Sequence, residues 1–200
     1  MNYLAHAYLS FNNPPVLYGN MISDFLKGKT QYDYPPEIRA GIILHRAIDT
    51  FTDDHEITKE IRKYFSEDYR LYSGPFTDIT YDYFLANDKN IFSDEEDLKK
   101  FSLHTYNNLR RFENSFPEKF SVIFPMMTTH NWLYNYREEW AIKRSFRGLT
   151  LRSKFLKDYE TAFKIFIENK NQINILYHEF FPLLKNFSIQ KLDELLSTDI

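Results

Sequence analysis

The sequence predicts an all-α fold, a single-domain helical bundle that spans residues 1–200. Apolar residues recur at spacings of three and four through most of the chain, which is typical of helices buried on one side. Only 5 glycines and 8 prolines are present, too few for a turn-rich all-β fold. The 19 Phe, 15 Tyr and 2 Trp supply bulky side chains, and 200 residues are enough to bury a substantial core.

Proline and glycine separate the first predicted helices. The helix over residues 1–12 ends at the Asn12-Asn13-Pro14-Pro15 segment, and the helix over 16–27 is closed by Gly28. A third helix begins at Pro36, because proline fits the first turn, and it continues to about Thr52. Ser73-Gly74-Pro75 opens the next, which runs to about Ala86.

The second half of the chain begins with a clear helix start. Ser93 is followed by four acids, which combines a capping hydroxyl with negative charge in the first turn. Further helices are predicted over 94–113, 119–134, 136–147, 152–169, 171–185 and 188–196. Trp132 and Trp140 are expected in an aromatic core.

The composition excludes several classes of site. The absence of Cys excludes disulfides, Cys-ligated zinc and thiol nucleophiles, and it is consistent with the cytoplasm, where we expect the protein. The chain opens without the basic segment of a secretory signal, and no apolar run approaches the ~18 residues of a membrane span. The net charge of −3 gives no reason to expect a nucleic-acid partner.

Four polar pairs with a spacing of four residues lie in the N-terminal half. They are Asn2 with His6, Asn20 with Asp24, His45 with Asp49, and Asp78 with Asp82. Residues at this spacing share a helix face, and here their neighbours are apolar. Ionisable groups on a buried face are usually paired or metal-bound, because desolvating an unpaired charge is costly. Imidazole and carboxylate ligands from facing helices suit Mn, Fe, Zn or Mg.

Two other interpretations of these pairs remain open. With 28 acids in the chain, such spacings also arise by chance, as Glu56 with Glu60 illustrates. The pairs therefore predict either a metal site, a structural network of hydrogen bonds, or scattered positions on the surface.

The amino-acid sequences of these segments resemble those of a known family. The blocks that carry the resemblance are Asn2-Tyr3-Leu4-Ala5-His6, Gly19-Asn20-Met21-Ile22-Ser23-Asp24-Phe25, Gly41-Ile42-Ile43-Leu44-His45-Arg46-Ala47-Ile48-Asp49 and Asp78-Ile79-Thr80-Tyr81-Asp82-Tyr83-Phe84-Leu85. In order and spacing they are similar to the conserved blocks of the acyl carrier protein phosphodiesterase family. The resemblance covers residues 1–90 and can be followed to Phe180-Phe181-Pro182.

The resemblance implies an HD-like fold, since that family is a divergent branch of the all-helical HD-type metal phosphohydrolases. It also implies hydrolysis of the phosphodiester between the serine of acyl carrier protein and its 4′-phosphopantetheine, with Mn²⁺ or Mg²⁺. By the same carry-over, the metal-ligand candidates are Asp24, His45, Asp78, Asp82, His6 and Asp49, with Asn2 and Asn20 in supporting positions. Arg46 is a candidate for steadying the phosphate, and Asp49 or Asp82 for the general base.

A basic run lies in the second half of the chain. Residues 143–157 contain no acid and include Lys143, Arg144, Arg147, Arg152, Lys154 and Lys157. This positive patch is a candidate docking surface for an acidic carrier protein. An ordinary solvated helix surface is the alternative interpretation.

Two rival functions remain open at this stage. An HD-like phosphohydrolase with a nucleotide or another small phosphoester as substrate would use the same metal chemistry. A non-enzymatic helical interaction protein would bind no metal and gain no thermal stability from Mn²⁺.

Overall fold

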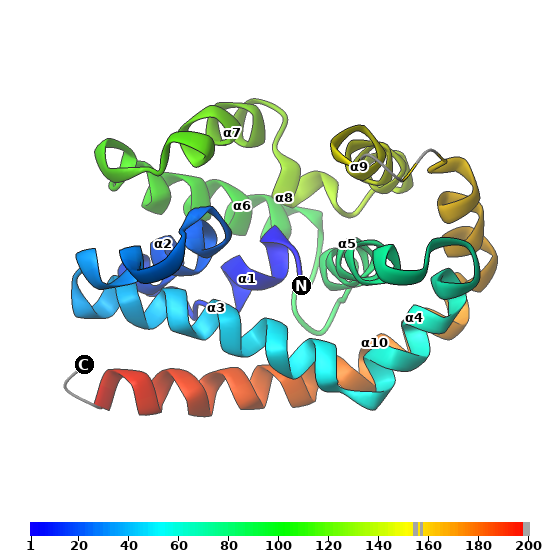
Figure 1. The fold of residues 1–200 in the computed structure, drawn as a ribbon, viewed down its shortest axis with the longest axis horizontal. Coiled ribbons are helices and arrows are strands. Elements are labelled where there is room, and N and C mark those ends of the chain that lie inside the picture. Colours follow the sequence, from blue (N-terminus) through cyan, green and yellow to red (C-terminus); the bar gives the residue numbers. More distant parts are fainter. Residues whose placement is uncertain (154–155, 157, 198–200) are drawn as a thin grey trace.

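The computed structural model describes residues 1–153, 156 and 158–197. These residues form ten α-helices and no strand, which confirms the predicted all-α fold (Figure 1). The helices are α1 (Tyr3–Tyr8), α2 (Pro14–Ile22), α3 (Pro36–Asp54), α4 (Glu56–Tyr69), α5 (Ser73–Ala86), α6 (Glu95–Arg110), α7 (Glu118–Thr129), α8 (Trp132–Asn135), α9 (Glu139–Arg152) and α10 (Glu160–Ser197). Short 3₁₀ helices follow α2 (η1, Ser23–Phe25; η2, Gly28–Asp33), α4 (η3, Arg70–Tyr72) and α6 (η4, Glu113–Ser115). None of the described helices is long and apolar enough to cross a membrane.

Several predicted boundaries are wrong. α4 occupies a segment for which no helix is predicted, although Ile61 and Phe65 are spaced for one and are fully buried. α10 continues through both predicted breaks, and Pro182 lies inside it. α9 extends to Arg152, so the helix expected to begin there does not. In α10 the buried residues run along the helix, and packing against α3 and α4 outweighs the local break signals.

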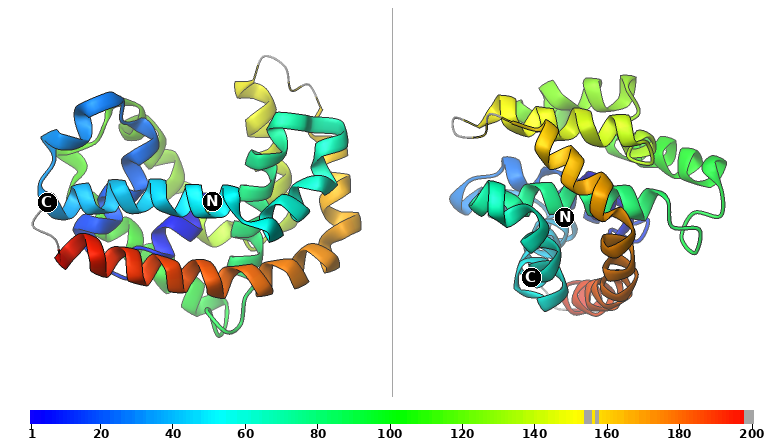
Figure 2. Two further views of the ribbon diagram at one scale, coloured as in Figure 1. Left: turned by 60° about the horizontal axis from the view of Figure 1, so that its bottom comes forward. Right: turned by 90° about the vertical axis from the view of Figure 1, so that its right-hand side faces the viewer.

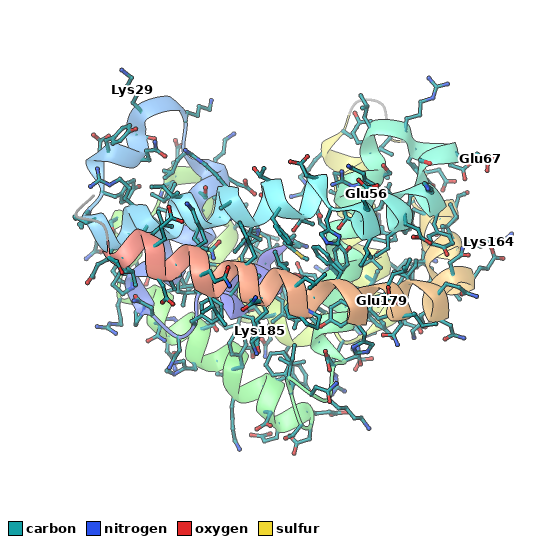
Figure 3. The ribbon with its side chains drawn as sticks, turned by 90° about the horizontal axis from the view of Figure 1, so that it is seen from below. Lys29, Glu56, Glu67, Lys164, Glu179 and Lys185 are labelled. Carbon is teal, nitrogen blue, oxygen red and sulfur yellow. The ribbon has the colours of Figure 1, made fainter. Side chains whose placement is uncertain are left out.

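α3 and α10 lie side by side along the molecule (Figures 1 and 2). An aromatic core fills the end where α4, α5, α9 and α10 meet. The Phe146 ring stands edge-on to Phe65, Phe76 and Phe166, with ring centroids 4.8–6.3 Å apart. Charged residues such as Lys29, Glu67 and Lys164 point away from the core (Figure 3). Trp132 packs against the core, but Trp140 is 53% exposed, so its predicted place in the core is wrong.

α2 and α3 approach each other more closely than side chains normally allow. A Cβ atom on Gly19 would lie 1.9 Å from the carbonyl oxygen of Ile38, and one on Gly41 would lie 2.2 Å from that of Val16. Only glycine fits at these two contacts, because the obstructing atoms belong to the backbone. The close approach brings Asn20 on α2 within hydrogen-bonding distance of His45 on α3.

We expect Gly41→Ala to lower the free energy of unfolding by roughly 1–3 kcal/mol or more, because the added methyl group forces α2 and α3 apart. Gly148→Ala is the matched control, since a Cβ there meets nothing within 4 Å. In a helix it should raise stability by roughly 0.5–1 kcal/mol. Urea denaturation of both variants measures the effect, and equal stability of the two would contradict the packing described here.

Candidate metal centre

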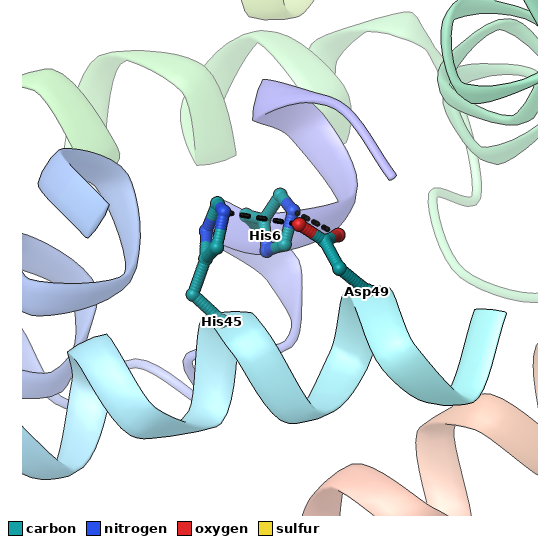
Figure 4. Close-up of side chains that lie close together, drawn as sticks. All are labelled: His6, His45 and Asp49. Carbon is teal, nitrogen blue, oxygen red and sulfur yellow. Dashed lines mark ion pairs between the residues drawn. The ribbon is translucent and has the colours of Figure 1, made fainter. Parts of the chain in front are cut away.

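Two imidazoles and a carboxylate form the centre of the candidate site. His6 on α1, with His45 and Asp49 on α3, offers ligand atoms that all lie within 4.8 Å of one another (Figure 4). Asp49 bridges the two rings: its Oδ1 lies 3.2 Å from His6 Nε2, and its Oδ2 lies 3.2 Å from His45 Nε2. His45 and Asp49 are one turn apart, so the helix itself holds them on the same face.

Asp24 adds a second carboxylate at the same nitrogen. It lies in η1, just after α2 ends, and its Oδ1 is 3.1 Å from His45 Nε2. Its side chain is 76% exposed, whereas that of His45 is 6% exposed. One ring nitrogen can give a proton to only one of the two carboxylates, but a cation at this point would attract both.

Asn20 fixes the orientation of the His45 ring. Its amide nitrogen donates to the His6 carbonyl at 3.0 Å and to Ser10 Oγ at 3.1 Å. Its Oδ1 therefore faces His45 Nδ1, at 3.2 Å, and accepts the proton of that nitrogen. Nε2 is left to meet Asp24 and Asp49, as in metal sites whose histidines donate through the other ring nitrogen. Burial alone would lower the pKa of His45, but hydrogen bonds to the two carboxylates raise it to about 9.

His6 is a buried imidazole that lacks a hydrogen-bond partner for either ring nitrogen among the described residues. Its Nε2 lies near Asp49 but does not form a hydrogen bond of good geometry. The ring stacks on His45, with centroids 3.9 Å apart and planes 14° apart. Burial, and then the charge of His45, lower the pKa of His6 to about 4, so it is a neutral imidazole. A neutral, buried and unsatisfied nitrogen is suited to bind a divalent cation.

Asp82 is fully buried and holds α1 in place. Its Oδ2 accepts from the backbone N–H of Leu4 at 2.8 Å, and its Oδ1 accepts from that of Ala5 at 3.1 Å. The side chain of Asn2 does not cap this helix. Asp82, on α5, instead accepts the hydrogen bonds of the free N–H groups in its first turn. Burial raises the pKa of Asp82 to about 7, while the two amide hydrogen bonds oppose the rise. Both oxygens are thus already engaged, outside the group formed by His6, His45 and Asp49.

The remaining predicted site residues lie in different surroundings. Asp78 Oδ1 is 3.1 Å from the Met1 amino group, which also contacts Asp49 Oδ1 at 3.3 Å. Burial raises the pKa of Asp78. Asn2 donates to the Tyr136 hydroxyl at 2.9 Å. Arg46 is exposed, hydrogen-bonds Gln31, and lines a separate apolar groove together with Phe51 and Phe187.

A pocket of about 170 Å³ opens beside the candidate ligands. It is lined by Met1, Asn2, Tyr3, His6, Asn20, Met21, Asp24, His45 and Arg152. The structure thus brings together His6, Asp24, His45 and Asp49, and it places Arg46 outside their pocket.

Comparisons with known proteins place this chain in a family. The model of the family described as acyl carrier protein phosphodiesterase matches residues 1–184. The chain belongs to the acyl carrier protein phosphodiesterase family. A relative of that name from Yersinia pestis is 32% identical over 92% of this chain and 95% of its own length. Relatives of the same name from Klebsiella pneumoniae and Escherichia coli are 28% and 25% identical over 96% of this chain and 99% of their own lengths. The predicted family and its phosphodiesterase class are therefore confirmed. No solved structure matches the chain significantly.

Tyr3, Met21 and Arg152 line the pocket of this family member but were not predicted to do so. Tyr3 lies three residues before His6, a spacing that places both on one side of α1 and could have indicated it. Arg152 lies far away along the chain, and only the fold brings it to the pocket.

We expect Asp82→Asn to lower the free energy of unfolding by roughly 1–3 kcal/mol, because one buried amide at the start of α1 loses its acceptor. Asp94→Asn is the matched control: Asp94 caps α6 at an exposed site, where Asn caps equally well. Urea denaturation at pH 8, where the carboxylate is charged, compares the two. If Asp82→Asn proves as stable as the control, Asp82 does not hold α1 in this way.

Proposed function

We propose that the chain is a metal-dependent phosphodiesterase that hydrolyses the bond between acyl carrier protein and its 4′-phosphopantetheine, releasing the apo carrier. The substrate is proposed from the name shared by the family and its relatives. One observation supports metal dependence above all others. His6 Nε2, His45 Nε2 and the carboxylates of Asp24 and Asp49 converge beside one pocket, and His6 lacks a hydrogen bond there.

His6, His45 and Asp49 are the residues that would hold the ion, with Asp24 completing the set from the rim of the pocket. Their mixture of imidazole and carboxylate fits Mn²⁺ or Mg²⁺ as proposed cofactors. Such an ion, when bound, polarises the phosphate and lowers the pKa of a water molecule. Asn20 and Asp82 support the set: Asn20 orients His45, and Asp82 fixes the helix that carries His6.

The reaction adds water across the diester. The water oxygen bonds to phosphorus, the bond from phosphorus to the serine oxygen of the carrier breaks, and that oxygen takes up a proton. Asp49 contacts both imidazoles, which suits a holding role better than that of a base. Asp24 is the exposed carboxylate at the pocket, and only its Oδ1 lies at His45. We therefore propose that the other oxygen of Asp24 accepts the proton of the water.

The outer face of α9 is the proposed docking surface for the carrier protein. Trp140, Arg144, Arg147 and Leu151 are exposed and follow one another at helical spacing. Lys143 is engaged elsewhere, since its Nζ is 2.7 Å from Glu160. Lys154 and Lys157 lie outside the described residues. A surface with arginines between apolar side chains suits an acidic partner. The scissile bond adjoins the serine of the carrier, so the docking surface has to lie close to the pocket.

We expect Mn²⁺ at about 100 times its dissociation constant to raise the melting temperature of the wild type by roughly 5–10 °C. His45→Ala removes a candidate ligand and should abolish the shift, while His130→Ala, at an exposed helix end, should keep it. Differential scanning calorimetry measures both. A wild type without any shift would favour a helical protein that binds no such metal.

Release of phosphopantetheine from holo carrier tests the chemistry. Wild type with Mn²⁺ should turn over the holo carrier, whereas Asp24→Ala and His45→Ala should lose most of the turnover and retain less metal on elemental analysis. Both variants matching the wild type would show that the site is wrong. Turnover of nucleotides without release from holo carrier would instead identify a phosphohydrolase of different specificity.

We expect the double substitution Arg144→Glu with Arg147→Glu to raise the KM for holo carrier at least tenfold at low salt, with kcat little changed. The reason is that like charges then face the acidic carrier. Arg110→Glu with Arg111→Glu, at the exposed end of α6, is a control of equal charge change. Steady-state kinetics at two salt concentrations measure the difference, and an equal effect of both double variants would argue against docking on α9.

A further inference from the structure

Arg152 differs from the other basic residues of its run in where it lies. It lines the same pocket as Asp24 and His45, whereas Arg144 and Arg147 do not. Arg152 is exposed like Arg144 and Arg147, but at ~100° per residue it lies about 140° around the helix from Arg147 and so points to a different side of α9. The last turn of α9 therefore delivers one arginine to the candidate metal centre.

The guanidinium of Arg152 is anchored but not neutralised. Its Nε donates to the carbonyl oxygen of Gly148, one turn earlier, at 3.1 Å. Among the residues that the structure describes, no carboxylate pairs with it. Burial and Asp24 raise the pKa of the Tyr3 hydroxyl to about 12, and the charge of Arg152 opposes that rise. The charges of Arg152 and Asp24 thus both reach the Tyr3 hydroxyl in the pocket.

A substrate phosphodiester needs one more positive charge in the pocket, which an arginine would supply. Asp24 and Asp49 together would balance the charge of a divalent ion. The Met1 amino group also lines the pocket, and it lies 3.1 Å from Asp78, whose carboxylate balances its charge. A phosphodiester still carries one negative charge when it enters. A guanidinium matches two phosphate oxygens with two parallel N–H groups, which lysine does not.

We propose that Arg152 binds the phosphate group of the substrate diester inside the pocket, rather than the surface of the carrier protein. This inference rests on the proposed function, because it assigns a residue to the same site. It separates the basic run into two roles: Arg144 and Arg147 face the protein partner, and Arg152 faces the bond that is cleaved.

Kinetics of holo carrier hydrolysis with 4′-phosphopantetheine as product inhibitor test this assignment. The product carries the phosphate and the pantetheine arm but not the carrier, so it reports on binding in the pocket without carrier docking. We expect Arg152→Ala to lower kcat/KM roughly ten- to hundredfold and to raise the inhibition constant of the product by a similar factor. Arg152→Lys should recover part of both effects, because it keeps the charge without the paired N–H groups.

Arg110→Ala is the matched control, since Arg110 also lies exposed in the last turn of a helix and should leave both constants unchanged. Thermal melting of each variant verifies the fold. An inactive wild type would overturn the proposed function itself. With an active wild type, a normal kcat/KM for Arg152→Ala would overturn only this inference. So would a lowered kcat/KM with an unchanged inhibition constant, which would place Arg152 in carrier docking.

Discussion

The arrangement of the candidate site depends on one buried carboxylate. A helix of six residues is too short to be stable alone, and α1 is such a helix. Asp82, on α5, accepts the backbone N–H groups of Leu4 and Ala5 and so attaches the first turn of α1 to the core. His6 lies in the next turn and therefore meets α3 at a defined position. Asp82 belongs to the same polar pattern as the candidate ligands, but it binds the backbone of α1.

The electrostatics of the site follow from the close contact of α2 and α3. Gly19 and Gly41 let the two backbones approach, and the approach brings Asn20 to His45. Because the side-chain nitrogen of Asn20 donates to the His6 carbonyl and to Ser10 Oγ, its side-chain oxygen faces His45. The other nitrogen of His45 then faces Asp24 and Asp49 together, a concentration of negative charge that a cation stabilises.

The basic residues of α9 differ in the direction in which their side chains point, although they are close together in the chain. Lys143 is held by Glu160 and covers the ring of Phe163, so it joins α9 to α10. Arg144 and Arg147 are exposed on the outer face, and Arg152 lines the pocket. A run of like charge on a helix therefore contains side chains with different surroundings, since each residue points about 100° away from the previous one.

The sequence by itself determined the helical class, through the spacing of its apolar residues, and the family, through four ordered blocks. It also predicted that His45 and Asp49 share a helix face, because that relation needs only one helix. It did not reveal the continuity of α10, the capping of α1 by Asp82 or the arrival of Arg152 at the pocket. These features depend on contacts between residues far apart in the chain, which local spacing does not encode, and only the packed tertiary structure decides them.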